Sequence, residues 1–184
     1  MPVFISMLRG VNVGGHNKIG MEELRALFGS LGFSGAQTLI QSGNVVFRAS
    51  ERNAARVAER VEDGISSRFG FRPPVIVRNV PEMKKALAGN PFPAEAADEP
   101  GKLIVLFLGA LPDEAARRKA LEVKRGAEQL RFQGRELFVY YPDGQGKSKL
   151  AIAALERALG TTMTGRNWNT VNKLLDMAVA IEAA

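Results

Sequence analysis

The chain has 184 residues, and its apolar content of 46% and charged content of 24% are ordinary for a globular protein. It contains no cysteine and one histidine, which excludes disulfides, thiolate metal sites and cysteine nucleophiles and argues against any metal site. No apolar run reaches the about 18 residues of a membrane-spanning helix, and the start, MPVFISMLRG, lacks a signal peptide's basic leader. We therefore expect a cytoplasmic protein that does not enter a membrane.

The net charge of +6, with an isoelectric point near 9.9, is unevenly distributed. Residues 1–90 carry 12 basic against 7 acidic side chains, whereas residues 91–184 carry 13 against 12. Arg52, Arg56 and Arg60 follow one another at helical spacing. Such a row is either a solvated helix face or a track for phosphate groups, so the charge alone leaves nucleic-acid binding open.

The first half of the chain alternates strand and helix patterns. Residues 3–8 are a continuous apolar run typical of a buried strand, and a helical pattern of apolar residues follows over 21–31. Residues 37–41 and 44–48 predict two strands of a hairpin. A helical stripe over 54–69 and a strand over 74–78 complete the order β-α-β-β-α-β, which is that of the ferredoxin-like fold.

The second half repeats this order after an interruption. A helix begins near Pro81, and the stretch GNPFPAEAADEPG, residues 89–101, then breaks the pattern with three prolines, as a linker does. The patterns that follow predict a strand over 102–108, a helix over 112–124, strands over 128–132 and 136–141, and a helix over 148–159. No clear final strand follows; an amphipathic helix over 169–181 ends the chain.

We therefore predict an α+β protein of two ferredoxin-like subdomains packed together, the second ending in an extra C-terminal helix. The expected boundaries are 1–88 for the N-terminal subdomain, 89–101 for the linker and 102–184 for the C-terminal subdomain. The runs VFISML and LIVLFL do not alternate apolar and polar residues, so we expect both sheets to be covered on both faces. That expectation argues against a free sheet face on which RNA bases could stack.

The stretch LRGVNVGGHNKIG, residues 8–20, is the first candidate site. Its glycines allow tight turns whose successive backbone N–H groups can bind an anion, and the helix that follows adds its dipole. It lacks the G-x-G-x-x-G spacing of a dinucleotide site, and the alternative is a tight strand-to-helix connection. We give His16 no catalytic role, because no partner can be identified from spacing. The candidate ligand-binding residues are Arg9, Asn12, Gly14, Gly15, Asn17 and Lys18.

The second candidate is YPDGQGKSKL, residues 141–150, in which Gly-Lys-Ser precedes a predicted helix as at the end of a P-loop. Tyr141 stands where the Walker A pattern requires glycine, so this is not that motif. Lysines at a helix start oppose its dipole unless an anion is present, which favours an anion site. The alternative is a Pro-Asp-Gly turn with Ser148 as the helix cap. The candidate residues are Gly144, Gly146, Lys147 and Ser148.

The third candidate is TGRNWNT, residues 164–170, which contains the single tryptophan. Arginine and asparagine offer directional hydrogen bonds and tryptophan a stacking face; the alternative is a buried Trp168 beside a helix cap. The candidate residues are Arg166, Asn167, Trp168, Asn169 and Thr170. In QSGN, residues 41–44, a hairpin turn is expected, with Ser42 and Asn44 as candidate residues at the rim of a site.

Together these stretches resemble a bacterial family of uncharacterised proteins, the domain of unknown function 1697. The resemblance is carried by LRGVNVGGHNKIGMEELRALFGSLGF, QSGNVVF, NPF, GQGKSKL and TGRNWNTVNKL, in this order over nearly the whole chain. It implies two α+β subdomains of ferredoxin-like character. It implies no activity, cofactor or catalytic residue.

From these residues we predict that the chain binds a small phosphate-bearing or other anionic ligand, such as a nucleotide, provided that the motifs converge in a polar cleft. Two alternatives stay open: nucleic-acid binding through the basic surface, and an interaction or structural module without a ligand. The residues show no catalytic triad, metal cluster or paired carboxylates, so they decide neither an enzymatic activity nor a cofactor. The oligomeric state is likewise undecided.

Overall fold

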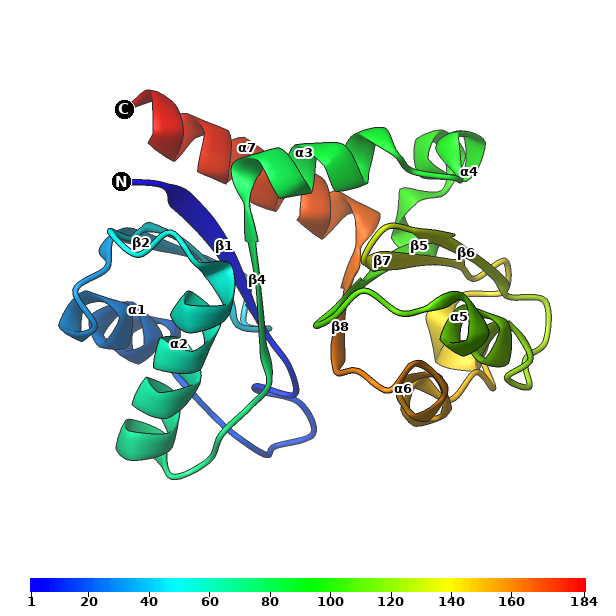
Figure 1. Ribbon diagram of the computed structural model, residues 1–184, viewed down its shortest axis with the longest axis horizontal. Coiled ribbons are helices and arrows are strands. Elements are labelled where there is room, and N and C mark those ends of the chain that lie inside the picture. The colour runs from blue at the N-terminus through cyan, green and yellow to red at the C-terminus, as the bar shows by residue number, and fades with distance from the viewer. The chain divides into compact units, whose positions relative to one another are not determined.

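A computed structural model describes residues 1–184, and helices are interspersed with strands along the chain (Figure 1). The elements of the first half are β1 (Val3–Leu8), α1 (Met21–Ser30), β2 (Ser34–Leu39), β3 (Asn44–Arg48), α2 (Ala54–Phe69), β4 (Val75–Asn79) and α3 (Val80–Ala88). Those of the second half are α4 (Pro93–Asp98), η1 (Pro100–Lys102), β5 (Leu103–Leu108), α5 (Glu114–Leu121), β6 (Gln129–Gln133), β7 (Glu136–Tyr140), η2 (Gln145–Lys147), α6 (Ile152–Leu159), β8 (Met163–Asn167) and α7 (Trp168–Ala183).

The strands form two separate four-stranded sheets, in the orders β2-β3-β1-β4 and β6-β7-β5-β8. Every neighbouring pair is antiparallel; Ile5, for example, lies between Val46 of β3 and Arg78 of β4. In both sheets the first strand is central and lies between the third and fourth strands. This is the ferredoxin-like arrangement twice over, followed by a C-terminal helix, so the predicted fold class is confirmed.

The chain divides into two compact units. Unit 1 comprises Met1–Lys85 and Lys173–Ala184, and unit 2 comprises Ala86–Asn172. The expected boundaries were residues 88 and 102. The observed divisions instead fall inside α3, after Lys85, and inside α7, before Lys173. All of α7 from Lys173 onward belongs to unit 1, where the Arg48 guanidinium donates hydrogen bonds to the Ile181 and Ala184 carbonyls.

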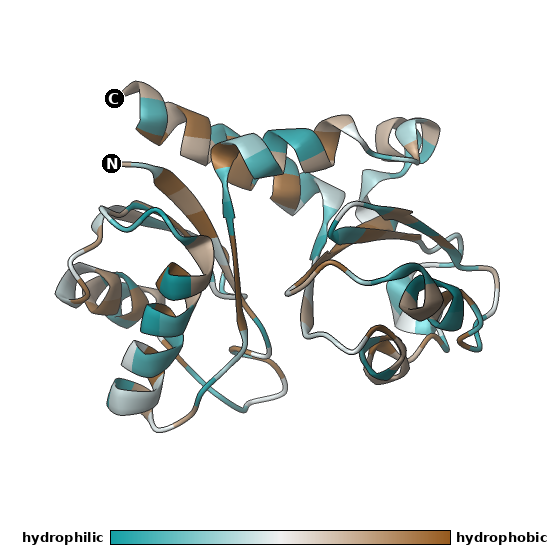
Figure 2. Ribbon diagram, viewed as in Figure 1, coloured by the Kyte–Doolittle hydropathy of each residue, from teal (hydrophilic) through white to brown (hydrophobic).

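The core of unit 1 lies between its sheet and the pair α1 and α2. Leu24, Leu27 and Phe28 of α1 and Val57, Val61 and Ile65 of α2 are the buried residues that form the helix faces of this core. The rings of Phe28 and Phe47 meet edge to face with centroids 4.9 Å apart, an arrangement that aromatic quadrupoles favour. The central strand is strongly apolar (Figure 2), and all six residues of β1 are buried, as its unbroken apolar run predicts.

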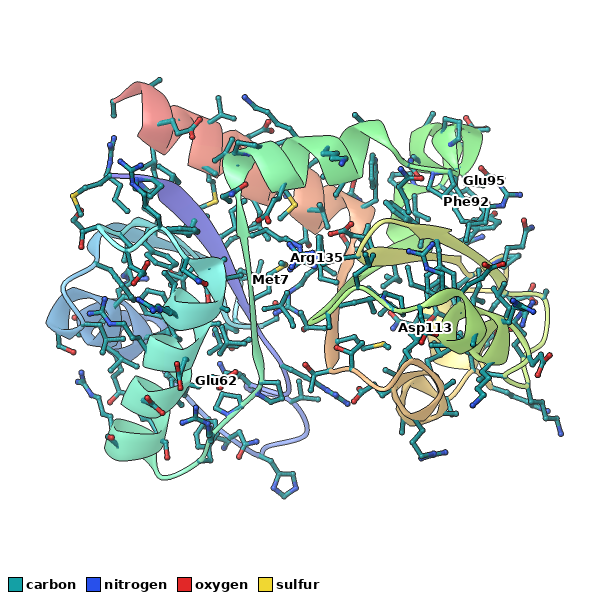
Figure 3. All side chains as sticks on the ribbon, viewed as in Figure 1. Met7, Glu62, Phe92, Glu95, Asp113 and Arg135 are labelled. Carbon is teal, nitrogen blue, oxygen red and sulfur yellow. The ribbon has the colours of Figure 1, made fainter.

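Glu62 ties α2 to the beginning of β4 (Figure 3). Its Oε1 accepts a hydrogen bond from the Val75 backbone N–H at 3.0 Å, and its Oε2 lies 3.1 Å from Arg72. Arg72 also pairs with Asp63. The turn between helix and strand is therefore held by an arginine that bridges two carboxylates of one helix.

Unit 2 repeats the arrangement with β5 at its centre. All six residues of β5 are buried, and Leu106, Leu137 and Leu155 are among the residues of its core. The helix α5 starts two residues later than Pro112, because the Asp113 side chain caps it by accepting a hydrogen bond from the Ala116 N–H at 2.7 Å.

Two expectations for the second half were wrong. A final strand, β8, is present and pairs with β5; its sequence MTGRN contains a glycine and three polar residues, so it lacks an apolar strand signal. The helix expected from Ser148 begins only at Ile152 and has no side-chain cap, because η2 and an extended Ser148 precede it.

The segment that we expected to be a linker, residues 89–101, contains α4 and η1 and belongs to unit 2. Phe92 anchors it: the side chain is fully buried, its ring centroid lies 6.1 Å from that of Tyr140, and the Arg131 guanidinium lies 4.3 Å from the ring (Phe92 is labelled in Figure 3). Proline breaks the helical pattern here, but a buried aromatic residue holds the segment against the sheet of unit 2.

Ser6 offers a test of the core of unit 1. It lies on β1 between the core residues Phe4 and Leu8, it is fully buried, and its hydroxyl has no hydrogen-bond partner. Since an unpaired buried hydroxyl costs about 1–3 kcal/mol, Ser6→Ala is expected to increase the free energy of unfolding by about 1 kcal/mol. Chemical denaturation measures this change, and a destabilised variant would contradict the expectation.

Candidate functional site

In unit 1 the glycine-rich stretch folds into a miniature hairpin. The Asn12 N–H donates to the Asn17 carbonyl and the His16 N–H to the Val13 carbonyl, both at 3.1 Å. Gly14 and Gly15 at the tip both have positive φ, 61° and 76°, which a two-residue type I′ turn requires. The turn geometry alone therefore explains why glycine stands at both positions, without a ligand.

Asn12 locks this hairpin to the rest of unit 1. Its Nδ2 donates to the Ile19 carbonyl at 2.9 Å and to the Gln41 carbonyl at 2.8 Å, and its Oδ1 accepts from the Ile19 N–H at 2.8 Å. Both amide hydrogens are thus used within the protein. Asn17 likewise has a positive φ and directs its Nδ2 to the Gly10 carbonyl at 3.4 Å. The alternative interpretation of the asparagines, that they bond local backbone, fits these contacts.

The QSGN turn lies beside the hairpin, through the contact of Asn12 with Gln41. Asn44 is fully buried and donates to the Leu39 carbonyl at 3.1 Å and to Ser42 Oγ at 2.9 Å, so it closes the turn. The turn also holds Ile40 at a φ of 50°, a strained value for a β-branched residue, with the side chain 57% exposed.

The two stretches enclose a hollow of about 310 Å³ at the start of α1, which we call the hairpin hollow. It is lined by Asn12, Gly15, Lys18, Ile19, Gly20, Met21 and Gln41. Lys18 is the basic residue of this lining, whereas the first turn of α1 carries Glu22 and Glu23, and the Glu23 carboxylate accepts from the Gly20 N–H at 3.4 Å. These carboxylates already complement the helix dipole. Arg9 does not line the hollow; its N–H donates to the Pro74 carbonyl.

In unit 2 the loop after β7 surrounds a second hollow, of about 240 Å³, which we call the Tyr141 hollow. It is lined by Gly126, Ala127, Glu128, Tyr141, Pro142, Asp143, Gly144, Lys147, Ser148 and Lys149. The loop turns at Pro142 and Asp143, where the Gly144 N–H donates to the Tyr141 carbonyl at 3.0 Å. Three of the four candidate residues of this motif line the hollow; Gly146 does not.

Glu128 organises one wall of the Tyr141 hollow. The Ser148 hydroxyl donates to Glu128 Oε1, and the Gly126 N–H donates to Oε2 at 2.6 Å. The hydrogen bond from Ser148 is the main reason that the pKa of Glu128 lies below its usual range. Ser148 Oγ also accepts from the Leu150 N–H at 3.1 Å. Ser148 therefore bridges Glu128 to the loop instead of capping a helix.

Tyr141 differs from every other polar residue of this loop. Its side chain is 98% removed from solvent and belongs to the core of unit 2, and the residue also lines the Tyr141 hollow. Burial, and to a lesser extent the charge of Glu128, raises the pKa of Tyr141 to about 12. At neutral pH the hydroxyl is therefore protonated. Tyr141 was not among the candidate residues of this motif, although its place after the apolar run ELFVY indicates burial.

The neighbouring Tyr140 is bonded in the opposite way. Its hydroxyl donates to Glu99, which also pairs with Lys102 at 2.6 Å. The hydrogen bond to Glu99 is the main reason that the pKa of Tyr140 is raised to about 12. The two adjacent tyrosines therefore share a pKa direction for different physical reasons.

The third candidate stretch forms the junction between β8 and α7. The Arg166 guanidinium donates to Thr164 Oγ1 and to the Gly165 carbonyl, both at 2.8 Å, and burial lowers its pKa to about 10. Asn167 Oδ1 accepts from the Thr170 N–H at 2.9 Å.

Trp168 packs on Phe138 with ring centroids 6.4 Å apart, and Asn169 is exposed. Residues 166–170 line neither hollow, since the Tyr141 hollow is built from residues 126–128 and 141–149. The structure thus brings Asn12, Gly15 and Lys18 together with Gln41, and Gly144, Lys147 and Ser148 together with Tyr141. Each set lies within its own unit.

No group of three or more histidine, cysteine, aspartate or glutamate side chains is placed to hold a metal ion. None of the helices combines the length and the apolar character needed to cross a membrane.

A family model described as a protein of unknown function, DUF1697, matches residues 1–138, which confirms the resemblance found in the motifs. Among solved structures, the conserved bacterial protein SP0830 from Streptococcus pneumoniae is similar over 96% of this chain and 98% of its own, with a TM-score of 0.72 and 21% sequence identity. At that identity the likeness shows the fold alone. No curated protein matches the chain.

The lock formed by Asn12 can be tested against Asn17, which has a similar positive φ but one long side-chain hydrogen bond. Asn12→Ala removes three short hydrogen bonds, so we expect a loss of about 2 kcal/mol in the free energy of unfolding and a smaller loss for Asn17→Ala. Denaturant titration compares the two variants. Equal losses would mean that backbone strain, not the Asn12 amide, accounts for the effect.

The two tyrosines are the only ones in the chain, so their titration can be followed directly by ultraviolet absorbance. We expect phenolate to form around pH 12 for both, with no transition near the ordinary value of 10. Because the folded state holds these protons more tightly than the unfolded chain, their stabilising contribution is complete below about pH 10 and is lost as the pH rises toward 12. A tyrosine that titrates near pH 10 in the folded protein would contradict the assigned environments.

Proposed function

We propose, for a chain that belongs to the DUF1697 family of proteins of unknown function, that the Tyr141 hollow binds a small phosphate-bearing or other anionic ligand. The observation that carries the proposal is that a buried tyrosine, Tyr141, lines this hollow together with two exposed lysines, Lys147 and Lys149. A hydrogen bond from a tyrosine hydroxyl to a charged acceptor is worth about 1.5–3 kcal/mol. A ligand oxygen placed at this hydroxyl would gain that interaction.

The lysines of the loop supply the charge for an anion. Lys147 and Lys149 are exposed and line the same hollow as Tyr141, where they can contact a phosphate or carboxylate without the cost of prior burial. Neither is paired with a carboxylate within 4 Å, so an anion would not have to displace an existing ion pair. This favours an anionic group on the lysine side of the hollow.

Glu128 and Asp143 line the hollow as well and would repel an anion placed next to them. Both oxygens of Glu128 already accept hydrogen bonds, from Ser148 and Gly126, which reduces its demand for a further partner. A ligand that fits this charge pattern has an anionic group near the lysines and a hydrogen-bond donor near the carboxylates. A nucleotide, with its phosphate and exocyclic amine, combines both features.

The test is equilibrium binding by calorimetry with inorganic phosphate, mononucleotides and a short oligonucleotide, each at low and high salt. Tyr141→Phe is expected to weaken binding of the small ligand about 10-fold or more, because it removes the phenol donor and leaves the packing of the ring unchanged. Tyr140→Phe is the matched control: it removes a hydroxyl already engaged with Glu99, and affinity is expected to stay unchanged.

Three outcomes would contradict the proposal. They are the absence of binding by all the small probes, equal affinity of the wild-type chain and Tyr141→Phe, and binding of the oligonucleotide alone with a steep loss in salt. The last outcome would assign the chain to nucleic-acid binding through its basic surface, since affinity for a polyanion depends strongly on salt.

A further inference from the structure

A third concavity lies in unit 1, lined by residues of the α1 and α2 regions, and it is unrelated to the proposed ligand site. It has a volume of about 490 Å³. Leu27 and Leu31 of the α1 region and Gly64 of α2 form its floor, and Arg60 and Arg68 of α2 lie at its rim. We call it the α1–α2 groove.

Gly64 determines how close the two helices come. A Cβ atom built there would lie 3.2 Å from methyl groups of both Leu27 and Leu31, and this distance is shorter than that of ordinary side-chain contacts. A glycine inside a helix costs about 1 kcal/mol relative to alanine, so close packing is the compensating gain.

The charges at the rim of the groove are held in place. The Arg60 guanidinium lies 4.8 Å from the centre of the Phe33 ring and donates to the Leu31 carbonyl, and that of Arg68 lies 5.7 Å from the centre of the Phe69 ring. Asp63 also lines the groove, but it is paired with Arg72. The groove therefore presents an apolar floor between two exposed arginines, with its one carboxylate already neutralised.

The spacing of the arginines fits one kind of partner. Arg60 and Arg68 are eight residues apart on one helix, which is about 12 Å, and Gly64 lies midway. In a second helix laid along α2, two carboxylates that are seven or eight residues apart in sequence lie about 10–12 Å apart along the axis. The residues at i+3 and i+4 lie between these carboxylates on the same face of that helix. Apolar residues at those positions would enter the groove over Gly64.

We propose that the α1–α2 groove binds an acidic amphipathic helix of a partner protein, with carboxylates at i and i+7 contacting Arg60 and Arg68 and apolar side chains at i+3 and i+4 on the leucine floor. This is the helix-in-groove mode of recognition, in which apolar anchors supply affinity and flanking charges set the register. It gives a role to part of the basic row of α2 that the ligand site does not use.

The experiment measures the binding of a fluorescein-labelled, alanine-based helical peptide of more than about 15 residues by fluorescence anisotropy. The peptide carries Glu at i and i+7 and Leu at i+3 and i+4. One control peptide has Lys in place of both Glu residues, and a second has Ala in place of both Leu residues. We expect the full-length chain to bind the first peptide and each control at least 10-fold more weakly.

The matched protein variants are R60E/R68E, inside the groove, and R52E/R56E, which makes the same charge change just before α2 and in its first turn. R60E/R68E is expected to bind the Glu peptide at least 10-fold more weakly and to bind the Lys peptide better, whereas R52E/R56E keeps the wild-type preference. If R60E/R68E does not fold, because Arg60 also packs on Phe33, R68E alone provides the test through an exposed side chain.

Four results would overturn the proposal: no binding of the Glu peptide to the wild-type chain, equal binding of the Glu and Lys peptides, binding that does not depend on the leucines, and equal weakening by R52E/R56E and R60E/R68E. Concentration-dependent dimerisation that R60E/R68E abolishes would also overturn it, since the occupant would then be a second copy of the chain. The peptide measurements use no small anion, so their failure is distinguishable from failure of the Tyr141 hollow.

Discussion

The burial of two central strands constrains everything else in this chain. β1 and β5 are hydrogen-bonded to neighbours on both edges and have no exposed residue, so neither strand can present a functional side chain to solvent along its length. A buried backbone must also be paired, and a register shift in the first sheet lies on its edge strand β2, between Ser34 and Gln37. Surfaces available for binding therefore lie elsewhere: in the loops, on the edge strands and on the outer faces of the helices. The hairpin hollow, the Tyr141 hollow and the α1–α2 groove occupy these places.

Polar residues in these loops fall into two physical groups. Asn12, Asn44 and Asn167 direct their amides at backbone groups of their own unit, and these contacts explain why asparagine stands there without any ligand. Tyr141 is different, because it belongs to the core of unit 2 and also lines the Tyr141 hollow. A purely structural role would be served equally well by phenylalanine. This difference, more than glycine content or charge, separates a candidate binding group from residues that shape a turn.

The strands and helices with strong periodicity could be predicted from the sequence, and so could the doubled ferredoxin-like order. The failures have local physical causes. β8 has polar residues, and Arg166 is buried in it with hydrogen bonds to Thr164 and Gly165, so its strand pairing is stable without an apolar pattern. The start of α6 was placed too early because Ser148 matches a cap by type, whereas its hydroxyl bonds to Glu128, twenty residues earlier. The spacing of residues along the sequence does not predict a hydrogen-bond partner that far away.

The basic character of the chain also acquires a more specific meaning. An even coat of arginines would favour a polyanion, but several arginines of unit 1 already have defined neighbours: Arg48 bonds to the end of α7, Arg60 packs on Phe33, and Arg72 bridges two carboxylates. Their side chains serve as apolar and hydrogen-bonding contacts as much as charges. The cations of the Tyr141 loop, Lys147 and Lys149, form no ion pair. The unpaired lysines that line the Tyr141 hollow are the cations on which the proposed anion site rests.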